Sequence, residues 1–284
     1  MQINFLADIR ARMNEFTKAE KKIAEYILNN SDNVPYMVIN DLAEACNVGE
    51  TSIFRFCKKL KLTGYQEFRM KISSATFGEN VLRPTTSGTI NVDDSILDVA
   101  DKILASNIMA LEETKTLLNE RDIQRAVNLL INAKRVFVFG VGASGIMAQD
   151  TVGKFLRITS KFTTFIDSHQ QIMQASILEP DDVAIFFSYS GNTRDTIETA
   201  KMVKTTKAKT IGISKFRSSE FSKYMDVLLL CGAKEHPLRG GSLSAKMSQI
   251  YLIDILYTEY YKRTIKESKK YNDKTAQAVM NKLY

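Results

Sequence analysis

A loop rich in hydroxyl groups, residues 188–193, separates an apolar run at 183–187 from a helical pattern at 195–203. The loop therefore stands between an expected strand and the amino end of an expected helix. Backbone N–H groups and the positive end of a helix dipole favour an anion at such a place. The hydroxyls of Ser188, Ser190 and Thr193, with Gly191 allowing close backbone approach and no Lys present, suit a small phosphate monoester. A simple helix cap would need one hydroxyl, so capping alone is the weaker interpretation.

A second loop, Gly140-Val141-Gly142-Ala143-Ser144-Gly145, follows the apolar run 136–139 and opens another helical pattern. Its spacing is GxGxxG, and Asp167 lies 22 residues after Gly145. That combination is the dinucleotide-binding fingerprint with its acidic partner, although the glycine spacing alone has low specificity. A nucleotide-dependent oxidoreductase is therefore one alternative function.

The elements that must position these loops form an alternating pattern. Apolar runs without polar interruption, separated by helical patterns, indicate a parallel sheet covered on both faces. The pattern predicts an α/β doubly wound domain with a five-stranded parallel sheet, preceded by amphipathic stretches at about 94–118 and 120–133. The five expected strands are 136–139, 162–166, 183–187, 210–213 and 227–230.

Residues 1–77 have a different, all-α pattern with three apolar stripes at helical spacing. The second and third stripes have helix-turn-helix spacing, with the first helix ending near Cys46 and the next beginning near Thr51. Residues 78–93 lose this periodicity and collect Gly, Pro, Thr and Ser, which indicates a linker. We expect a helix-turn-helix domain at 1–77, a linker at 78–93 and the α/β domain at 94–284.

The net charge of +7 is concentrated in two short segments, 55–71 and 262–284, each of which carries +5. The first coincides with the expected second helix of the helix-turn-helix, whose amino-terminal part would meet base edges in the major groove. A plain three-helix packing module is the alternative. We interpret the second segment as mostly a solvated helical face. The candidate base-reading residues are Thr51, Ser52 and Arg55; Glu50 lies on the same outer side; the candidate phosphate contacts are Lys58, Lys59, Lys61 and Tyr65.

The composition excludes several other classes of protein. No apolar run approaches the ~20 residues that span a bilayer, and the amino-terminal residues do not form a signal peptide. Three cysteines without metal-ligand or CxxC spacing favour reduced thiols in the cytoplasm. We expect no metal, no cofactor and no membrane partner.

Residues 39–72 resemble the DNA-binding domain of the RpiR family of bacterial transcriptional regulators. The resemblance is carried by Arg55-Phe56-Cys57, Leu60 and Gly64-Tyr65-Gln66-Glu67-Phe68. Gly49 stands where the family usually has Ser, and Gly is also an acceptable N-cap. Lys61 stands where the family commonly has Gly, at a cost in stability if its backbone is left-handed.

Residues 94–284 resemble the sugar isomerase (SIS) domain, a phosphosugar-binding fold that the RpiR family joins to its DNA-binding unit. The glycine loop, the hydroxyl loop and residues 235–255 carry this resemblance. Gly240 and Gly241 stand where the family tends to have Ser. The resemblance implies a phosphosugar site whose phosphate contacts are Ser188, Ser190, Gly191, Asn192 and Thr193, whose glycine-loop contacts are Gly142, Ala143 and Ser144, and whose residues nearer the sugar are His169, Glu235 and Arg239.

A regulator is favoured over an enzyme, because a pocket that only reports occupancy needs no general base. We expect a DNA-binding regulator of sugar metabolism that binds an operator in double-stranded DNA and responds to a phosphorylated sugar. The alternative is an aldose-ketose phosphosugar isomerase with a helical accessory domain, for which Glu235 and His236 could supply a base. Helices near 94–118 and 242–264 are the expected surfaces of a homodimer or homotetramer.

Overall fold

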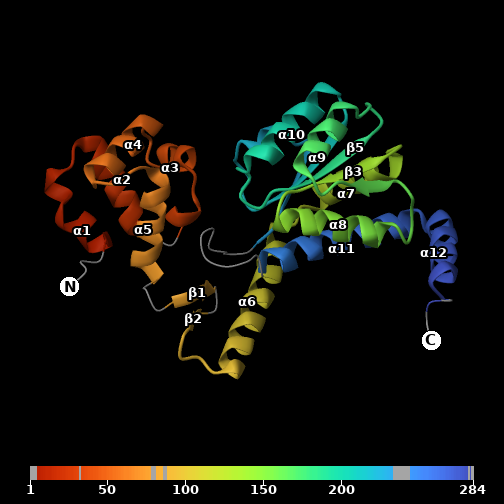
Figure 1. The fold of residues 1–284 in the computed structure, drawn as a ribbon, viewed down its shortest axis with the longest axis horizontal. Helices are drawn as coiled ribbons and strands as arrows, with labels where there is room; N and C mark the ends of the chain where they lie inside the picture. Colours follow the sequence, from red (N-terminus) through yellow and green to blue (C-terminus); the bar gives the residue numbers. More distant parts are fainter. Residues whose placement is uncertain are drawn as a thin grey trace. The chain divides into compact units, whose positions relative to one another are not determined.

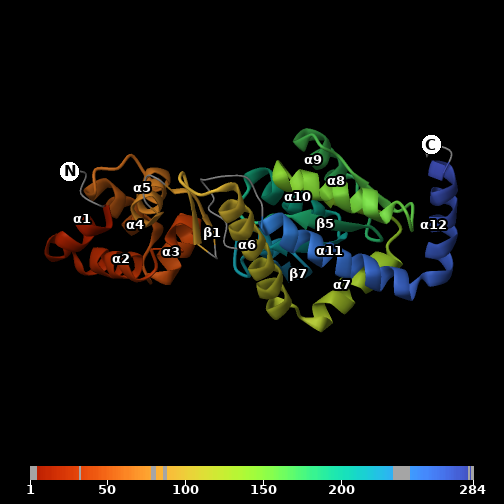
Figure 2. The ribbon, with the colours of Figure 1, turned by 90° about the horizontal axis from the view of Figure 1, so that it is seen from below.

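The computed structural model describes residues 5–31, 33–77, 81–85, 88–232, 244–280 and 282. The chain divides into two compact units, and the division falls between Ala105 and Ser106. Figures 1 and 2 show the secondary structure of each unit. In the described residues, none of the helices is long and apolar enough to cross a membrane.

The amino-terminal unit begins with five α-helices. They are α1 (Phe5–Ala11), α2 (Lys18–Asn29), α3 (Ile39–Ala45), α4 (Glu50–Lys59) and α5 (Tyr65–Phe77), with 3₁₀ turns at Met13–Glu15 and Val34–Tyr36. The sequence predicted three of these helices. The others were missed because α1 buries only Ile9 and the stripe of α5 is short, with Phe68 and Ile72 buried in the same core.

A capping box starts α2, where Thr17 and Glu20 each accept a backbone N–H of the other. Inside the unit Phe56 of α4 lies edge-on to Phe16, with ring centroids 5.1 Å apart, and to Phe68, at 6.2 Å. These aromatic contacts hold α4 by its inner side and leave the other side for solvent.

The segment expected as a linker contains an antiparallel hairpin of β1 (Val81–Thr85) and β2 (Gly88–Asn91). The 22-residue helix α6 (Ile96–Leu117) follows it and extends past the division between the units. Ser106, Ala110 and Thr114 form its buried stripe.

The carboxy-terminal unit holds a five-stranded parallel sheet in the order β4-β3-β5-β6-β7. Every residue of β3 and β5 is buried, as the uninterrupted apolar runs require. The predicted bounds of β3, β5 and β7 agree with the structure, while β4 is shorter than expected. The strands are β3 (Val136–Phe139), β4 (Phe162–Thr164), β5 (Val183–Phe187), β6 (Lys209–Ser214) and β7 (Val227–Leu230).

Helices cover both faces of this sheet (Figure 1). One face packs against α7 (Glu120–Asn132), α8 (Ala143–Phe155) and α11 (Ser244–Arg263). The other packs against α9 (Ser168–Ser176) and α10 (Arg194–Thr205), with a 3₁₀ turn at Phe221–Tyr224. The last helix is α12 (Ile265–Met280). The result is the predicted doubly wound architecture.

Candidate functional site

The second helix of the helix-turn-helix, α4, presents a polar outer side. The turn at 46–49 contains Asn47 in a left-handed conformation (φ 51°), and Gly49 is the N-cap, as the sequence indicated. Thr51, Arg55 and Lys58 are exposed, and Glu50 is exposed beside them. Arg55 makes no ion pair or hydrogen bond within the described residues. This is the arrangement that a base-reading side chain requires.

Phe54 lies on the same outer side of α4, and sequence reasoning missed it. Its side chain is 45% exposed, and the Lys58 ammonium lies 5.2 Å from the centre of its ring. Thymine methyl groups are apolar features of the major groove that an exposed phenyl ring can contact. The sequence did contain a signal for this residue: Ile53 and Phe54 are consecutive bulky apolar residues, and a helix that buries Ile53 must turn Phe54 outward.

Three of the four expected phosphate contacts make hydrogen bonds inside the unit. The Lys58 ammonium, although exposed, donates to the Thr63 carbonyl at 2.7 Å. The Lys59 ammonium lies 2.7 Å from a Glu20 carboxylate oxygen and donates to the Glu15 carbonyl at 2.8 Å. The Tyr65 hydroxyl donates to the Met37 carbonyl at 3.1 Å, and burial raises the pKa of Tyr65. Lys61, by contrast, is exposed and has the left-handed backbone (φ 62°) that the comparison with Gly suggested.

Arg69 also uses its charge internally, donating from two guanidinium nitrogens to the Pro35 carbonyl at 2.9 and 2.7 Å. Of the basic residues between 55 and 71, four remain exposed: Arg55, Lys58, Lys61 and Lys71. The outward charge of this segment is therefore smaller than the sequence sum. It is concentrated on α4 and directly after it.

In the carboxy-terminal unit, the two loops singled out in the sequence leave neighbouring strands. The strand order reverses between β3 and β5, because the chain runs outward from β3 to β4 on one side and through β5 to β7 on the other. In a doubly wound sheet ligands bind at the carboxyl ends of the strands beside such a reversal. The glycine loop follows β3 and the hydroxyl loop follows β5, so the fold brings the two together at this point.

The glycine loop folds tightly onto the first turn of α8. A Cβ atom on Gly140 would lie 2.5 Å from the Ser144 carbonyl oxygen, and Gly142 has φ 61°, so both positions require glycine. Gly142 is the N-cap of α8 and supplies no side chain, and the first turn contains no acidic residue. The first turn of α8 thus keeps its positive end free of a competing carboxylate.

The hydroxyl loop leaves the amino end of α10 uncapped by side chains. Thr193 is the N-cap residue, yet its side chain makes no capping hydrogen bond. Gly191 has φ 67°, and a Cβ atom there would lie 2.3 Å from the Ser219 hydroxyl oxygen. The capping interpretation of Thr193 is therefore wrong for this structure.

Ser188 carries the clearest sign of a missing partner. Its hydroxyl oxygen is buried and has no hydrogen-bond partner among the described residues. A buried hydroxyl without a partner costs free energy that a bound hydrogen-bonding group would recover. Nearby, the Ser190 hydroxyl accepts from Asn192 N at 3.3 Å, and the Asn192 amide donates to the Ser190 carbonyl at 2.9 Å.

Helix α9 fixes the glycine loop from the other side. The buried Gln171 amide donates to the carbonyls of Gly140 and Phe165, both at 2.8 Å, and sequence reasoning did not identify it. His169 is exposed in the first turn of α9. Asp167 is the N-cap of α9, where it accepts Gln170 N at 2.9 Å, so the carboxylate of the alternative dinucleotide fingerprint serves a structural role.

An open hollow of about 620 Å³ lies on the β4 side of the glycine loop, lined by Val141, residues 164–168 and Gln170. That size is within the range of small-molecule sites. The hydroxyl loop, on the β5 side, does not line it. The hollow and the hydroxyl loop therefore lie on different sides of the glycine loop.

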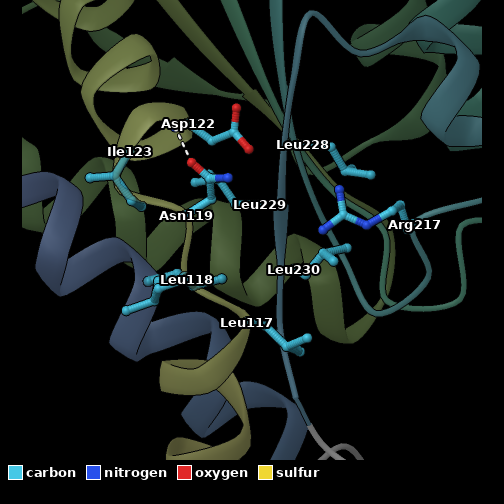
Figure 3. A pocket seen from close by; sticks show the side chains of 10 residues that line it. Leu117, Leu118, Asn119, Asp122, Ile123, Arg217, Leu228, Leu229 and Leu230 are labelled. Carbon is cyan, nitrogen blue, oxygen red and sulfur yellow. Dashed lines mark hydrogen bonds between the residues drawn. The ribbon is translucent and has the colours of Figure 1, made fainter.

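A second cavity, shown in Figure 3, lies beside β7 and the start of α7. Leu117 and Leu118 before α7 and the three leucines of β7 line it, together with Asp122 and Arg217. Its volume of about 10 Å³ holds one water molecule at most, so it is not a sugar site.

Two expected sugar contacts, Glu235 and Arg239, lie outside the described residues, together with Gly240, Gly241 and His236.

In the described part of the chain, no group of three or more His, Cys, Asp or Glu residues could hold a metal ion. The cysteines form no disulfide, and burial raises the pKa of Cys46 to about 11 and that of Cys57 to about 12.

Family models match a segment of each of the two units. Residues 3–77 match the family model described as a helix-turn-helix domain of the rpiR family, and residues 129–259 match the SIS domain model. An HTH-type transcriptional regulator of Caldanaerobacter subterraneus is 35% identical over 268 residues, covering 94% of this chain and 92% of the relative. The HTH-type transcriptional regulator RpiR of Escherichia coli is 27% identical, covering 92% of this chain and 87% of its own.

Solved structures resemble the whole chain or its sheet domain. The NanR protein of Vibrio vulnificus, complexed with ManNAc-6P, superposes with a TM-score of 0.82 at 26% identity and covers 99% of this chain and 100% of its own. A phosphoheptose isomerase from Francisella tularensis, at 16% identity and a TM-score of 0.50, covers 60% of this chain and 100% of its own. At that identity the isomerase shows a shared fold only.

Proposed function

Because the chain belongs to the RpiR family of helix-turn-helix transcriptional regulators with a SIS domain, we propose that a phosphorylated sugar bound between β3 and β5 controls its affinity for an operator. In this proposal residues 1–77 bind DNA, residues 78–93 connect, and residues 94–284 bind the effector. A regulator of transcription acts where the chromosome lies, so we place it in the cytoplasm.

The observation that carries the effector site is the buried hydroxyl of Ser188 between two helix ends without side-chain caps. A phosphate oxygen would accept from Ser188, from the Ser190 and Thr193 hydroxyls and from N–H groups at the start of α10. Gly191 and Asn192 would contribute N–H groups, which without ligand donate to the Ser188 carbonyl and the Ser190 hydroxyl, and Gly142, Ala143 and Ser144 would approach from α8. The complex of NanR with ManNAc-6P supports this ligand class.

The sugar would extend from the phosphate toward the glycine loop, whose position Gln171 fixes. His169, Glu235 and Arg239 are the proposed contacts to the sugar. We propose that the ligand is an effector and not a substrate, since the full-length relatives are named as transcriptional regulators. Turnover of a sugar phosphate by the purified protein would contradict this part of the proposal.

On α4 we propose that Thr51, Ser52 and Arg55 read bases, with Phe54 beside them and Glu50 at the rim of the site. Lys58 and Lys61 would hold phosphates. We assign Lys59 and Tyr65 to the stability of the unit, because their polar atoms are already engaged with Glu20, Glu15 and Met37.

Ligand-induced thermal stabilisation tests the effector site directly. A panel of sugar phosphates, with the free sugars and inorganic phosphate as controls, should contain a compound that raises the melting temperature. The double variant Ser190→Ala/Thr193→Ala should lose this shift and its ligand-dependent change in DNA binding, yet keep the basal affinity for DNA. A matched variant, Ser218→Ala/Thr205→Ala, removes hydroxyls elsewhere in the unit and should respond like the wild type. A normal response of the first variant would refute the assigned phosphate site.

A further inference from the structure

The last helix, α12, carries four exposed lysines on one side. Lys266, Lys269, Lys270 and Lys274 have i+3 and i+4 spacing, which places them on a common helix face. We call these four residues the lysine row. Within the part of the chain that the structure describes, none of them has an ion pair or a hydrogen bond. Successive members at i+4 are separated by about 6 Å along the helix axis.

The opposite side of α12 is fixed to its own unit. Ser268 is fully buried, the Tyr271 hydroxyl lies 3.4 Å from the Ser160 hydroxyl, and the Thr275 hydroxyl donates to the Arg157 carbonyl at 3.4 Å. These contacts hold the helix in one orientation, so the lysine row points to solvent. Figure 1 shows α12 following directly from the end of α11.

The lysine row is an unfavourable arrangement for the helix itself. Like charges at i, i+4 destabilise a helix by about 0.2–0.5 kcal/mol per pair, and Lys266 in the first turn opposes the helix dipole. Several lysines elsewhere in this unit have carboxylate partners, as Lys134 has with Glu179 and Lys223 has with Glu220. Glu267 and Asp273 are the acidic residues of α12, and Asp273 lies at i+4 from Lys269, so the helix keeps a net charge of +2. Within the described residues neither acid forms an ion pair with the lysine row, and the remaining positive excess is complementary to an anionic partner.

We propose that the lysine row is a second DNA-contacting surface, which binds the phosphate backbone of a duplex without reading its sequence. A duplex presents one negative charge per ~1.7 Å of axis, which a row of lysines can follow. An anionic membrane suits the helix less well, because its exposed large apolar residues, Ile265, Val279 and Met280, lie at the two ends of α12 and form no continuous apolar face. The proposal goes beyond the function proposed above, which assigns DNA binding to α4 and Lys61, and it rests on the chain being a DNA-binding protein.

The salt dependence of DNA binding by the full-length protein tests this surface. We compare the wild type with Lys266→Gln/Lys270→Gln/Lys274→Gln, using a fluorescent duplex of random sequence and a series of KCl concentrations. Each lost phosphate contact should lower the slope of log K against log salt by about 0.9, so the triple variant should lose about 2–3 in slope. The control Lys115→Gln/Lys207→Gln/Lys209→Gln removes three exposed lysines elsewhere and should keep the wild-type slope.

Equal slopes for the two triple variants would overturn the proposal. Binding of the same proteins to phosphatidylserine vesicles tests the membrane alternative. The proposal also fails if the triple variant of the lysine row loses vesicle binding while its slope for DNA is unchanged. Melting curves confirm that both variants fold. Failure of this inference alone is recognised when Arg55→Ala still weakens DNA binding but the row variant does not. If the wild type binds no duplex at any salt concentration, the DNA-binding function itself fails.

Discussion

Three residues with a left-handed backbone conformation lie in or beside the two candidate sites. Gly142 and Gly191 have positive φ in the loops that follow β3 and β5, a conformation that favours glycine, and a Cβ atom on Gly191 would also collide with the Ser219 side chain. Lys61 has a similar conformation (φ 62°) just after α4, where its side chain adds charge but its Cβ adds strain. At this position stability and affinity for DNA should therefore change in opposite directions.

We expect Lys61→Gly to raise the free energy of unfolding. A non-glycine residue in the left-handed region costs about 1–2 kcal/mol, and the greater freedom of Gly in the unfolded chain offsets part of it, leaving a net gain of about 0.5–1 kcal/mol. Urea denaturation measures this change. Asn47→Gly is the matched control, because Asn tolerates the left-handed region and should gain less. A less stable Lys61→Gly variant would contradict the argument.

A substitution at Ser188 should lower the affinity for ligand without lowering the stability of the free protein. Ser188→Ala removes a buried hydroxyl without a partner, so the melting temperature of the free protein should stay the same or rise. The same change removes a proposed phosphate donor and should weaken binding by roughly 10-fold, about 1.4 kcal/mol. Calorimetry with the sugar phosphate identified in the panel measures the affinity. An unchanged affinity would exclude Ser188 from the site.

At the scale of elements, ion pairs hold the edge of the sheet opposite the proposed ligand site, and the pair between Arg135 and Asp182 is shorter than those that Lys134 and Arg135 form with Glu179. Arg135, just before β3, donates to both carboxylate oxygens of Asp182, just before β5, at 3.0 and 2.5 Å. The Glu179 N–H donates to the same carboxylate at 2.8 Å. The pair thus joins the two strands whose other ends carry the glycine and hydroxyl loops.

Asp182 should make stability depend on pH in acid. Burial of Asp182 opposes ionisation, but the hydrogen bonds from Arg135 and Glu179 outweigh it and lower its pKa below the ordinary value of 3.8. The stabilisation is therefore complete above that ordinary value and is lost as the pH falls through the lower pKa of the folded state.

We expect Asp182→Asn to cost about 2–3 kcal/mol near neutral pH, a value below that for a fully buried pair because Arg135 is partly exposed. Its stability should change less than that of the wild type between pH 5 and the acid limit of the fold. Urea denaturation at several pH values tests both statements. Parallel acid profiles for the two proteins would show that another carboxylate is responsible.

On the scale of the whole molecule, α6 is the stronger of the two expected association surfaces. Most of α11 packs against its own sheet, whereas α6 exposes Leu104 (59%) and Ile108 (46%), one turn apart. Exposed apolar residues in such a row indicate a surface covered by another chain. We therefore propose that α6 contributes to the dimer that a helix-turn-helix protein needs for two half-sites.

Leu104→Glu/Ile108→Glu should convert that dimer to a monomer, because charges replace the apolar contact. Sedimentation velocity over a range of protein concentrations measures the change. Leu156→Glu/Ile177→Glu alters comparably exposed apolar residues elsewhere and is the control. A wild type that sediments as a monomer at micromolar concentration would refute the proposed association.

The sequence by itself determined those features that depend on neighbouring residues. The uninterrupted apolar runs located β3, β5 and β7, and helix-turn-helix spacing located α3 and α4. The glycine loop and the hydroxyl loop were recognisable as candidate ligand-binding loops, because glycine and hydroxyl residues at a strand end have local conformational and hydrogen-bonding consequences.

Only the tertiary structure decided how individual polar groups are used, because their partners lie far away in the chain. Lys59 was expected to bind phosphate, but Glu20, 39 residues earlier, holds its ammonium inside the unit. Gln171 positions Gly140 across 31 residues, and Ser188 was left without a partner by the way the surrounding elements pack. Burial and long-range hydrogen bonds are set by packing, which a local pattern of residue types does not specify.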